Sequence, residues 1–189
     1  SDVCSSDLTM IIAFHADNHS DTDQETSYRK LKEQIPYDKD CKYIWMYDGN
    51  HVKDPSIDAK RSDGKPTDQT RPKGISGANA CKTKWGGMSD AYRSKNKKPQ
   101  IRKDYTRRAT IKKNADTGDI EIETWRRIDY IDVTTNMLGD TLPNVHKVEH
   151  ILPTSEELLA IRIEGSKTCW SDHAAVQLTM RYSTTPRPK

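Results

Sequence analysis

Two motifs in the C-terminal third of the chain hold side chains that could act together on a charged substrate. Asp172 and His173 stand just before residues 176–182, in which apolar and polar side chains alternate as in a half-buried strand. Upstream, Asp129 lies inside the apolar run 125–133, which predicts a second strand and in which a carboxylate is costly unless a partner holds its charge. Histidine is one of the few side chains that could do so, and we therefore expect Asp129 to pair with His173.

The segment Arg-Ile-Asp-Tyr-Ile around Asp129 and the segment Ser-Asp-His that ends at His173 resemble, in order and separation, the two C-terminal motifs of the endonuclease/exonuclease/phosphatase superfamily. This superfamily includes DNase I, abasic-site endonucleases, deadenylases, neutral sphingomyelinases and inositol phosphatases. The resemblance implies an α/β fold, the C-terminal part of a DNase I-like two-sheet α/β sandwich. It also implies a metal-dependent phosphoester hydrolase, either a phosphodiesterase or nuclease or a sphingomyelinase-like enzyme.

The same resemblance implies a role for each motif residue. His173 would hydrogen-bond the scissile phosphate, and Asp129 would hold the tautomer and the charge of His173. Asp172 would contribute to the metal site, which suits Mg²⁺ or Mn²⁺ because it is lined with hard carboxylate oxygens.

The family's Asp-x-Asn motif ends a central strand, and its counterpart here follows the apolar run Met10–Phe14. In the register that keeps the acid, Asp17 would orient or deprotonate the attacking water, and His19 stands where the family has asparagine. A neighbouring register keeps Asn18 and puts Ala16 in place of the acid. Apart from the resemblance, Asp17 also suits a helix cap or a turn, because the stretch around it is rich in turn-forming residues.

The resemblance covers only the C-terminal part of the family's domain. An asparagine, a metal-binding glutamate and a second histidine from the family's N-terminal half have no assigned counterpart in this sequence. We therefore expect the chain to be a fragment that is inactive by itself toward phosphodiesters, because catalysis needs metal ligands that it lacks.

A strongly basic stretch lies between the two halves of the sequence. Arg93–Lys113 holds ten basic residues and one acid, Asp104. Such a run is usually a solvated face, but beside a phosphate site it would guide a polyanion or an anionic membrane surface. The side chains expected to contact such a substrate are Lys97, Lys98, Arg102 and Lys103. Nucleic acid and a phospholipid or sphingolipid headgroup both remain open as the substrate, and the alternative is a non-catalytic family member that binds an anionic partner through this stretch.

The composition indicates one folded domain with a thin core. The chain has 189 residues and a net charge of +3, with 33% hydrophobic and 31% charged residues. Residues 1–8 resemble a translated sequencing adapter and are set aside, which leaves a domain over 9–183 and a tail over 184–189. No apolar run approaches ~18 residues, so no transmembrane segment is expected.

Residue patterns predict the elements that must position these motifs. Strands are expected at 41–47, 120–125 and 146–152, an amphipathic helix at 27–35, and a short helix or turn at 156–159. Residues 48–79 are dominated by Gly, Pro and polar side chains and predict one long polar loop. Trp85 and Tyr92 could stack on a base or a lipid headgroup, but we expect them in the core.

Outside residues 1–8 the cysteines are Cys41, Cys81 and Cys169, without a Cys-x-x-Cys or another zinc-like spacing. One disulfide plus one thiol would suit a secreted protein, and three reduced thiols would suit the cytoplasm. The cysteine pattern leaves both locations open.

Overall fold

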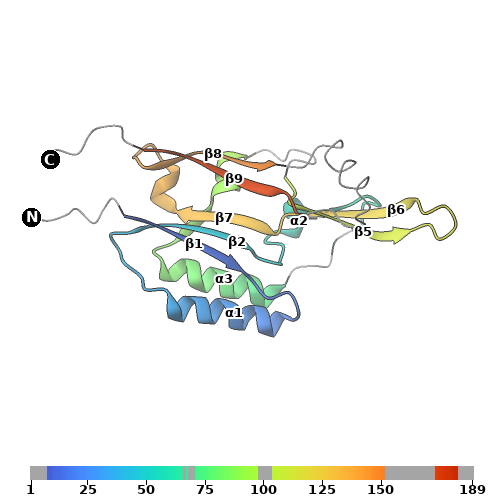
Figure 1. Cartoon of the computed structure of the whole chain (residues 1–189), viewed down its shortest axis with the longest axis horizontal. Helices are drawn as coiled ribbons and strands as arrows, with labels where there is room; N and C mark the ends of the chain where they lie inside the picture. Colours follow the sequence, from blue (N-terminus) through green and yellow to red (C-terminus); the bar gives the residue numbers. More distant parts are fainter. Residues whose placement is uncertain (1–7, 66, 68–70, 98–103, 152–172, 183–189) are drawn as a thin grey trace, which may run out of the picture.

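In the computed structural model, residues 8–65, 67, 71–97, 104–151 and 173–182 are described, and they form a mixed α/β fold (Figure 1). The largest sheet has four strands in the order β1-β2-β7-β4. β1 (Thr9–His15) is parallel to β2 (Lys42–Asp48), while β7 (Asp129–Thr134) is antiparallel to both β2 and β4 (Met88–Asp90). The predicted α/β class is confirmed at this level.

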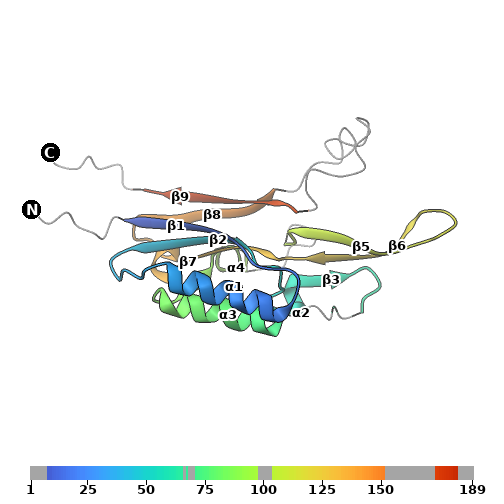
Figure 2. The same ribbon diagram turned by 60° about the horizontal axis from the view of Figure 1, so that its bottom comes forward.

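Two helices cover one face of this sheet. α1 (Asp21–Gln34) and α3 (Pro72–Lys84) lie side by side beneath β1 and β2 (Figure 2). α1 joins the parallel strands β1 and β2, which need such a crossover. The helix predicted at 27–35 is confirmed, but it begins earlier because the Ser20 side chain caps it by accepting a hydrogen bond from the Asp23 amide.

The opposite face is covered by a two-stranded antiparallel sheet, β8 (Asn144–Ile151) with β9 (Ala175–Arg181), so that the molecule has three layers (Figure 2). The alternation predicted near the C-terminus is confirmed up to Arg181, since Val176, Leu178 and Met180 are the half-buried side chains of β9, whereas Tyr182 follows the strand and is exposed. They pack with Ile44 and Ile131 of the large sheet.

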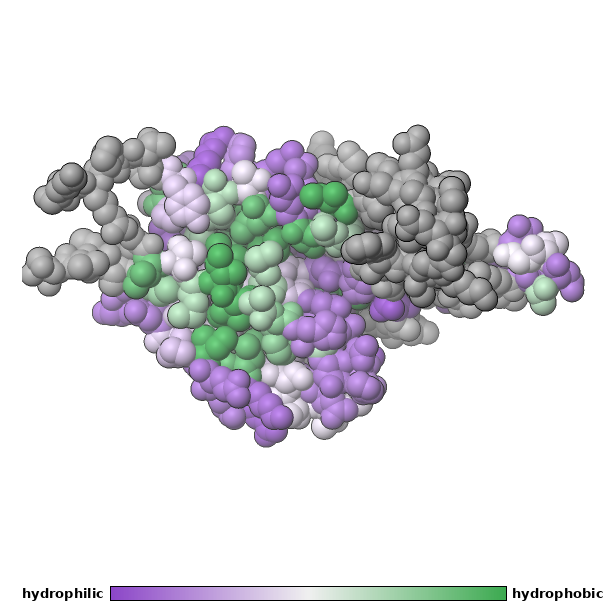
Figure 3. Space-filling model, in the orientation of Figure 1, coloured by the Kyte–Doolittle hydropathy of each residue, from purple (hydrophilic) through white to green (hydrophobic). Residues whose placement is uncertain are grey.

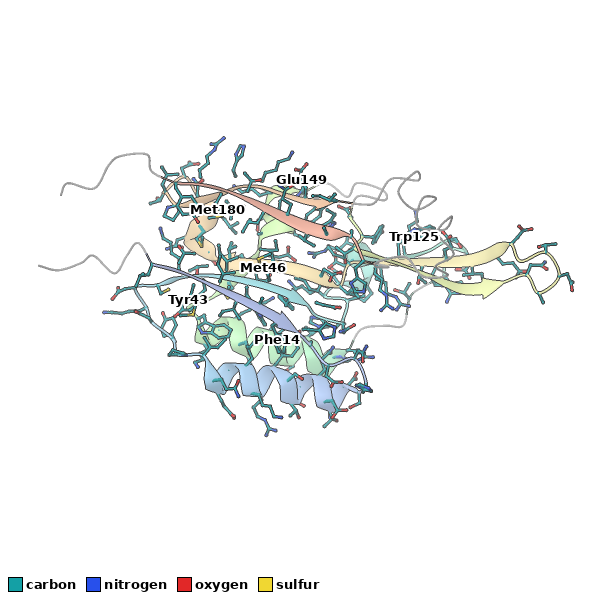
Figure 4. The ribbon with its side chains drawn as sticks, viewed as in Figure 1. Phe14, Tyr43, Met46, Trp125, Glu149 and Met180 are labelled. Atoms are coloured by element: carbon teal, nitrogen blue, oxygen red, sulfur yellow. The ribbon has the colours of Figure 1, made fainter. Side chains whose placement is uncertain are left out.

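The layer between the large sheet and the helices is an aromatic core. Trp45 stacks on Tyr47 with ring centroids 4.2 Å apart and meets Tyr28 edge-on at 5.8 Å. Phe14 and Tyr43 belong to this layer, whereas Met46 points to the layer beneath β9 (Figure 4). Trp85 and Tyr92 are also buried, which confirms that they are core residues.

A third sheet, in the order β3-β6-β5, consists of β3 (Ala59–Arg61), β6 (Ile120–Arg126) and β5 (Arg107–Lys113), and its β5–β6 hairpin projects from the molecule (Figure 1). The expectation of one continuous strand over 125–133 was wrong. β6 ends at Arg126 and β7 begins at Asp129, because Arg127 turns inward and its amide donates to the Asp58 carbonyl at 2.8 Å.

The prediction of one polar loop over 48–79 was also wrong. This range contains α2 (Pro55–Asp58), β3 and the first half of α3. The composition is misleading because α3 packs on α1 through small residues: a Cβ added at Gly77 would lie 2.9 Å from the Cβ of Tyr28. Small buried side chains make a helix face that looks polar in the sequence.

The remaining elements are the short helix α4 (Ala91–Lys95) and the 3₁₀ helix η2 (Thr135–Leu138). The helix or turn expected at 156–159 lies outside the described residues. Within the described ranges, no helix is long and apolar enough to cross a membrane.

Two of the three cysteines outside residues 1–8 can be assigned. Cys41 and Cys81 are buried free thiols, and burial raises the pKa of the Cys81 thiol to about 11. Cys169 lies outside the described residues. The structure therefore contains no Cys41–Cys81 disulfide.

A connected set of ion pairs is buried against the large sheet. Asp132 of β7 is fully buried and accepts Lys53 Nζ at 2.9 Å, Lys82 Nζ at 3.0 Å and the Tyr47 hydroxyl at 2.7 Å. Lys53 Nζ also lies 3.2 Å from Asp90.

The set continues through Arg127, which is 1% exposed. Its guanidinium lies 2.8 Å from Asp90 and 2.9 Å from Asp58. Arg93, the first member of the basic stretch, pairs with Asp58 at 2.5 Å and with Asp104 at 3.4 Å, so it does not belong to a solvated face. Four acids and four bases thus neutralise one another inside the fold.

The charges in this set depend on one another. Burial opposes the charge of Asp132, but Lys53 and Lys82 outweigh burial and lower the pKa of this carboxyl below its ordinary value. Burial likewise raises the pKa of Asp90, but the charges of Lys53 and Arg127 outweigh burial and lower this pKa below its ordinary value. Because the folded pKa values lie below the unfolded value of about 3.9, these acids stabilise the fold above that pH and lose their contribution as pH falls further.

We expect Arg127→Met to lower the free energy of unfolding by about 3–5 kcal/mol, because it leaves the buried carboxylates of Asp58 and Asp90 without this partner. Urea denaturation at pH 7 measures the change. The control is Lys147→Met, which removes an exposed ion pair with Glu149 and should have a small effect. Equal effects of the two substitutions would contradict the importance of the buried set.

Candidate active site

Three polar side chains stand in a row across the ends of three neighbouring strands. His15 at the end of β1 is in register with Asp48 at the end of β2, and Asp48 is in register with Asp129 at the start of β7. Residues directly opposite each other on paired strands share one face of the sheet. The strand ends therefore bring His15, Asp48 and Asp129 together on the face that β9 covers.

His173 joins this row from the segment before β9. Its Nδ1 lies 3.0 Å from Asp129 Oδ2 and 3.1 Å from Oδ1, and 3.8 Å from Asp48 Oδ2. The expected contact between Asp129 and His173 is thus confirmed. Because an ionised carboxylate only accepts hydrogen bonds, Nδ1 carries the proton that points to Asp129.

Thr106 holds both members of this pair. Its hydroxyl oxygen accepts hydrogen bonds from the amides of Ile128 at 3.0 Å and Asp129 at 3.1 Å. Its carbonyl accepts from the Ala174 amide at 2.6 Å. One buried residue therefore fixes the start of β7 and the segment that carries His173.

Asp48 is held in an unfavourable electrostatic position. Burial raises the pKa of its carboxyl, and the negative charge of Asp129 raises it further, against the lowering effects of the Asn50 amide and of His173 and His15. His15 Nε2 lies 3.5 Å from Asp48, and the side chain of His15 is 66% exposed. The site thus contains two facing carboxylates whose repulsion a bound cation would relieve.

The chain turns sharply after Asp48. The Asn50 amide donates to Asp48 Oδ1 at 2.8 Å, and the Asn50 side-chain amide donates to the Ala16 carbonyl at 2.8 Å. Asn50 has a φ of 47°, which asparagine tolerates better than most residues. Asp48 and Asn50 are therefore held at adjoining points at the ends of β1 and β2.

A cleft of about 490 Å³ lies over the row of polar side chains. Its walls are mainly apolar, and hydrophobic side chains are gathered on this face over β1 and β9 (Figure 3). The lining residues that lead to the polar end are Ala13, Phe14, Met46, Ile131, Ala174 and Val176.

Three groups at this site could hold a metal ion. Ligand atoms of Asp48, Asp129 and His173 all lie within 4.8 Å of one another, and each of these residues is half-buried. Because His173 Nδ1 already donates to Asp129, the two carboxylates are the main donor set. Such a set fits a hard divalent cation such as Mg²⁺ or Mn²⁺.

The other predicted catalytic residues do not belong to this group. Asp17 and His19 contact each other, with the His19 amide 2.7 Å and its Nδ1 3.1 Å from Asp17 Oδ1, and the His19 side chain is 83% exposed. The hydrogen bond from the His19 amide, the largest of several effects, helps to lower the pKa of Asp17. Asp17 thus forms a local turn, as its sequence context also allowed.

The predicted substrate and metal residues can be located only in part. Lys97 is exposed. The others, Asp172, Lys98, Arg102 and Lys103, lie outside the described residues.

Sequence reasoning missed three members of the site: His15, Asp48 and Asn50. The signal for two of them was present, because the strand predicted at 41–47 is followed directly by Asp48-Gly49-Asn50. This is the same pattern of a strand followed by Asp-x-Asn that was sought around Asp17. Only the strand order shows that β2, and not β1, lies next to β7.

In a chelating buffer, we expect Asp48→Asn to raise the free energy of unfolding at pH 7 by about 1 kcal/mol, as often happens when a functional charge is removed. The pKa of Asp48 in the folded protein lies above its unfolded value of about 3.9. Asp48 therefore does not destabilise the fold below this pH, and its destabilising effect grows as the pH rises toward the folded pKa. Urea denaturation between pH 3 and pH 8 measures this trend.

The control for this experiment is Asp54→Asn at the cap of α2, where hydrogen bonds from the Ser56 side chain and amide lower the carboxyl pKa. Its removal should slightly destabilise the protein. A stability loss for Asp48→Asn at neutral pH would contradict the repulsion inferred at the site.

In comparisons with known proteins, no family model matches the chain, and no curated protein matches it. Function must therefore be inferred from the side chains at the site.

Proposed function

We propose that the chain carries the phosphate-handling site of a metal-dependent phosphoester hydrolase with a DNase I-like two-sheet sandwich. The observation that carries this proposal is the Asp129–His173 contact with Asp48 facing both residues. A half-buried carboxylate beside a histidine and a second carboxylate can hold a cation, orient water and bind a phosphate oxygen.

The proposal revises the position of the Asp-x-Asn motif. Asp48-Gly49-Asn50 takes the role expected of Asp17, because Asp48 faces Asp129 and His173, whereas Asp17 pairs locally with His19. Asn50 then supplies the asparagine of this motif, where the register around Asp17 has His19. His15 offers a second histidine, whereas the asparagine of the family's N-terminal half remains without a counterpart. Both carboxylates of the site are aspartates, so the family's metal-binding glutamate still lacks a candidate among these residues.

The carboxylates of Asp48 and Asp129 would hold Mg²⁺ or Mn²⁺. When bound, the ion neutralises negative charge on the phosphate oxygens and thereby supports attack at phosphorus. The sequence expectation that Asp172 also contributes to the metal site remains part of the proposal.

The chain's own side chains account for the rest of the reaction. His173, oriented through Nδ1 by Asp129, directs Nε2 to a phosphate oxygen and donates a hydrogen bond to it. Asp48 accepts a proton from the attacking water as the water oxygen bonds to phosphorus and the ester P–O bond breaks. The leaving oxygen takes up a proton from solvent.

The test of this proposal is cation binding followed by turnover. We expect calorimetric titration with Mn²⁺ and Mg²⁺ to reveal one site, whose affinity falls about tenfold or more in Asp48→Asn and in Asp129→Asn. Asp54→Asn removes the same charge at an exposed cap and should leave the affinity unchanged. Absence of a saturable cation site in the unaltered chain would overturn the proposal.

Hydrolysis of bis(p-nitrophenyl) phosphate is then measured in the same cations. Binding without turnover would agree with the expectation that the chain needs further metal ligands. Turnover that His173→Ala abolishes would establish the activity directly and would show the expected inactivity to be wrong.

The basic stretch decides between the two substrate classes that the sequence left open. A backbone bridge between Arg107 of β5 and His173 brings Arg107, which belongs to this stretch, next to the site. If the stretch follows a phosphate backbone, binding of single- and double-stranded DNA should weaken steeply with salt, with a slope of about −0.7 to −0.9 per phosphate contacted.

Replacing Lys97, Lys98, Arg102 and Lys103 by Gln should flatten this slope, which fluorescence anisotropy at several salt concentrations measures. The matched control replaces Lys30, Lys32, Lys39 and Lys73, four basic residues from other parts of the chain. Equal slopes for the two variants would remove the nucleic-acid assignment and leave the lipid headgroup as the candidate substrate.

A further inference from the structure

Two buried side chains hydrogen-bond to the turn that carries Asp48 and Asn50. We propose that Gln24 and His51 are positioning residues, which aim Asp48 and Asn50 at the site by holding the Gly49 carbonyl between them. This inference rests on the proposed function for its catalytic meaning, but its structural part can be tested separately.

Gln24 ties the ends of β1 and β2 together. It is fully buried on α1, and its Nε2 donates to the Gly49 carbonyl at 2.8 Å and to the Asp17 carbonyl at 3.1 Å. Both acceptors are backbone oxygens just beyond the two parallel strands. One amide group therefore sets the distance between the chain segments that carry His15 and Asp48.

The orientation of the Gln24 amide is fixed by chemistry and by space. Two carbonyl acceptors require the NH₂ group on this side, because Oε1 would be repelled by both. On the other side, Gly74 of α3 lies so close that an added methyl group would overlap with Oε1 and Cδ of Gln24. α3 thus presses Gln24 toward the turn.

His51 holds the same carbonyl from the other side. The ring is 1% exposed, and Nδ1 lies 2.7 Å from the Gly49 oxygen, which can only accept, so Nδ1 carries the proton. Stacking on Tyr130, with centroids 5.7 Å apart, fixes the ring plane. Burial, aided by Lys53 and Lys82, lowers the pKa of His51 to about 4, so the ring remains a neutral donor at physiological pH.

The turn has little freedom on its remaining sides. The Gly49 amide donates to the Ile128 carbonyl at 2.7 Å, next to the start of β7. A side chain at Gly49 would lie 2.9 Å from the His51 ring and 3.1 Å from the Tyr47 ring. The peptide between Gly49 and Asn50 is therefore held by two donors at its oxygen. Loss of either donor lets the turn shift and Asp48 rotate away from Asp129.

The first test uses Gln24→Met, which keeps the side-chain length and removes both hydrogen bonds. We expect the Mn²⁺ affinity to fall roughly tenfold, as for loss of groups that orient metal ligands. We also expect faster amide hydrogen exchange at Gly49, measured by NMR. The control is Leu31→Ala, on the same buried face of α1, which destabilises the protein without touching the turn. It should leave both quantities unchanged once the loss of overall stability, measured by urea denaturation, has been taken into account.

The second test uses rescue at His51. His51→Phe keeps an aromatic ring but removes the donor, and should resemble Gln24→Met. His51→Asn supplies a donor at the position of Nδ1, and should restore at least part of the Mn²⁺ affinity and of the Gly49 protection. A purely structural role would instead favour Phe, because it preserves the packing on Tyr130.

The outcomes separate this inference from the proposed function. If Gln24→Met behaves like Leu31→Ala, or if Phe rescues better than Asn at position 51, the positioning role is wrong even though the site binds cations. If the unaltered chain binds no Mn²⁺, the proposed function fails. Faster amide exchange at Gly49 in Gln24→Met and His51→Phe, but not in Leu31→Ala, would then still support the inference that Gln24 and His51 hold the Gly49 carbonyl in place.

Discussion

Charge balance beneath the large sheet is the constraint on which this fold depends. Asp132 and Asp58 are almost completely buried, and each would be too costly to ionise without the cations around it. Those cations come from four different parts of the chain: Lys53, Lys82, Arg93 and Arg127. A chain with only 33% hydrophobic residues thus joins its helices to its sheets through matched charges and through the aromatic layer between them.

The two acids of β7 show how one strand serves both stability and the site. Asp129 and Asp132 are three residues apart and therefore lie on opposite faces of the sheet. Asp132 meets two lysines in the closed layer next to α3, whereas Asp129 meets His173 and faces Asp48 beside the cleft. The neutralised acid is part of the core, and the acid that faces another carboxylate is available for a cation.

The sequence predicted strands at the positions of β2, β6, β8 and β9, the α/β class and the Asp129–His173 contact, because each follows from local periodicity or from the cost of an unpaired acid. It did not predict β3, β4 and β5. It did not predict the place of Asp48, because two strands are followed by similar turns and only the sheet order decides which one lies next to β7. It also did not predict α3, whose buried residues Gly74, Ala78 and Cys81 are too small to give a helical hydrophobic pattern. The failures at Asp48 and at α3 concern contacts between residues far apart in the sequence, which a single sequence does not reveal.

The row of polar side chains at the strand ends is assembled from distant parts of the chain. The contact between Asp129 and His173 alone closes a separation of 44 residues, and His15 and Asp48 come from still earlier strands. Contacts of such sequence separation form only when most of the chain is already ordered. A ligand bound there would favour the native state over the unfolded chain by mass action, so that its occupancy reports on whether the protein as a whole is folded.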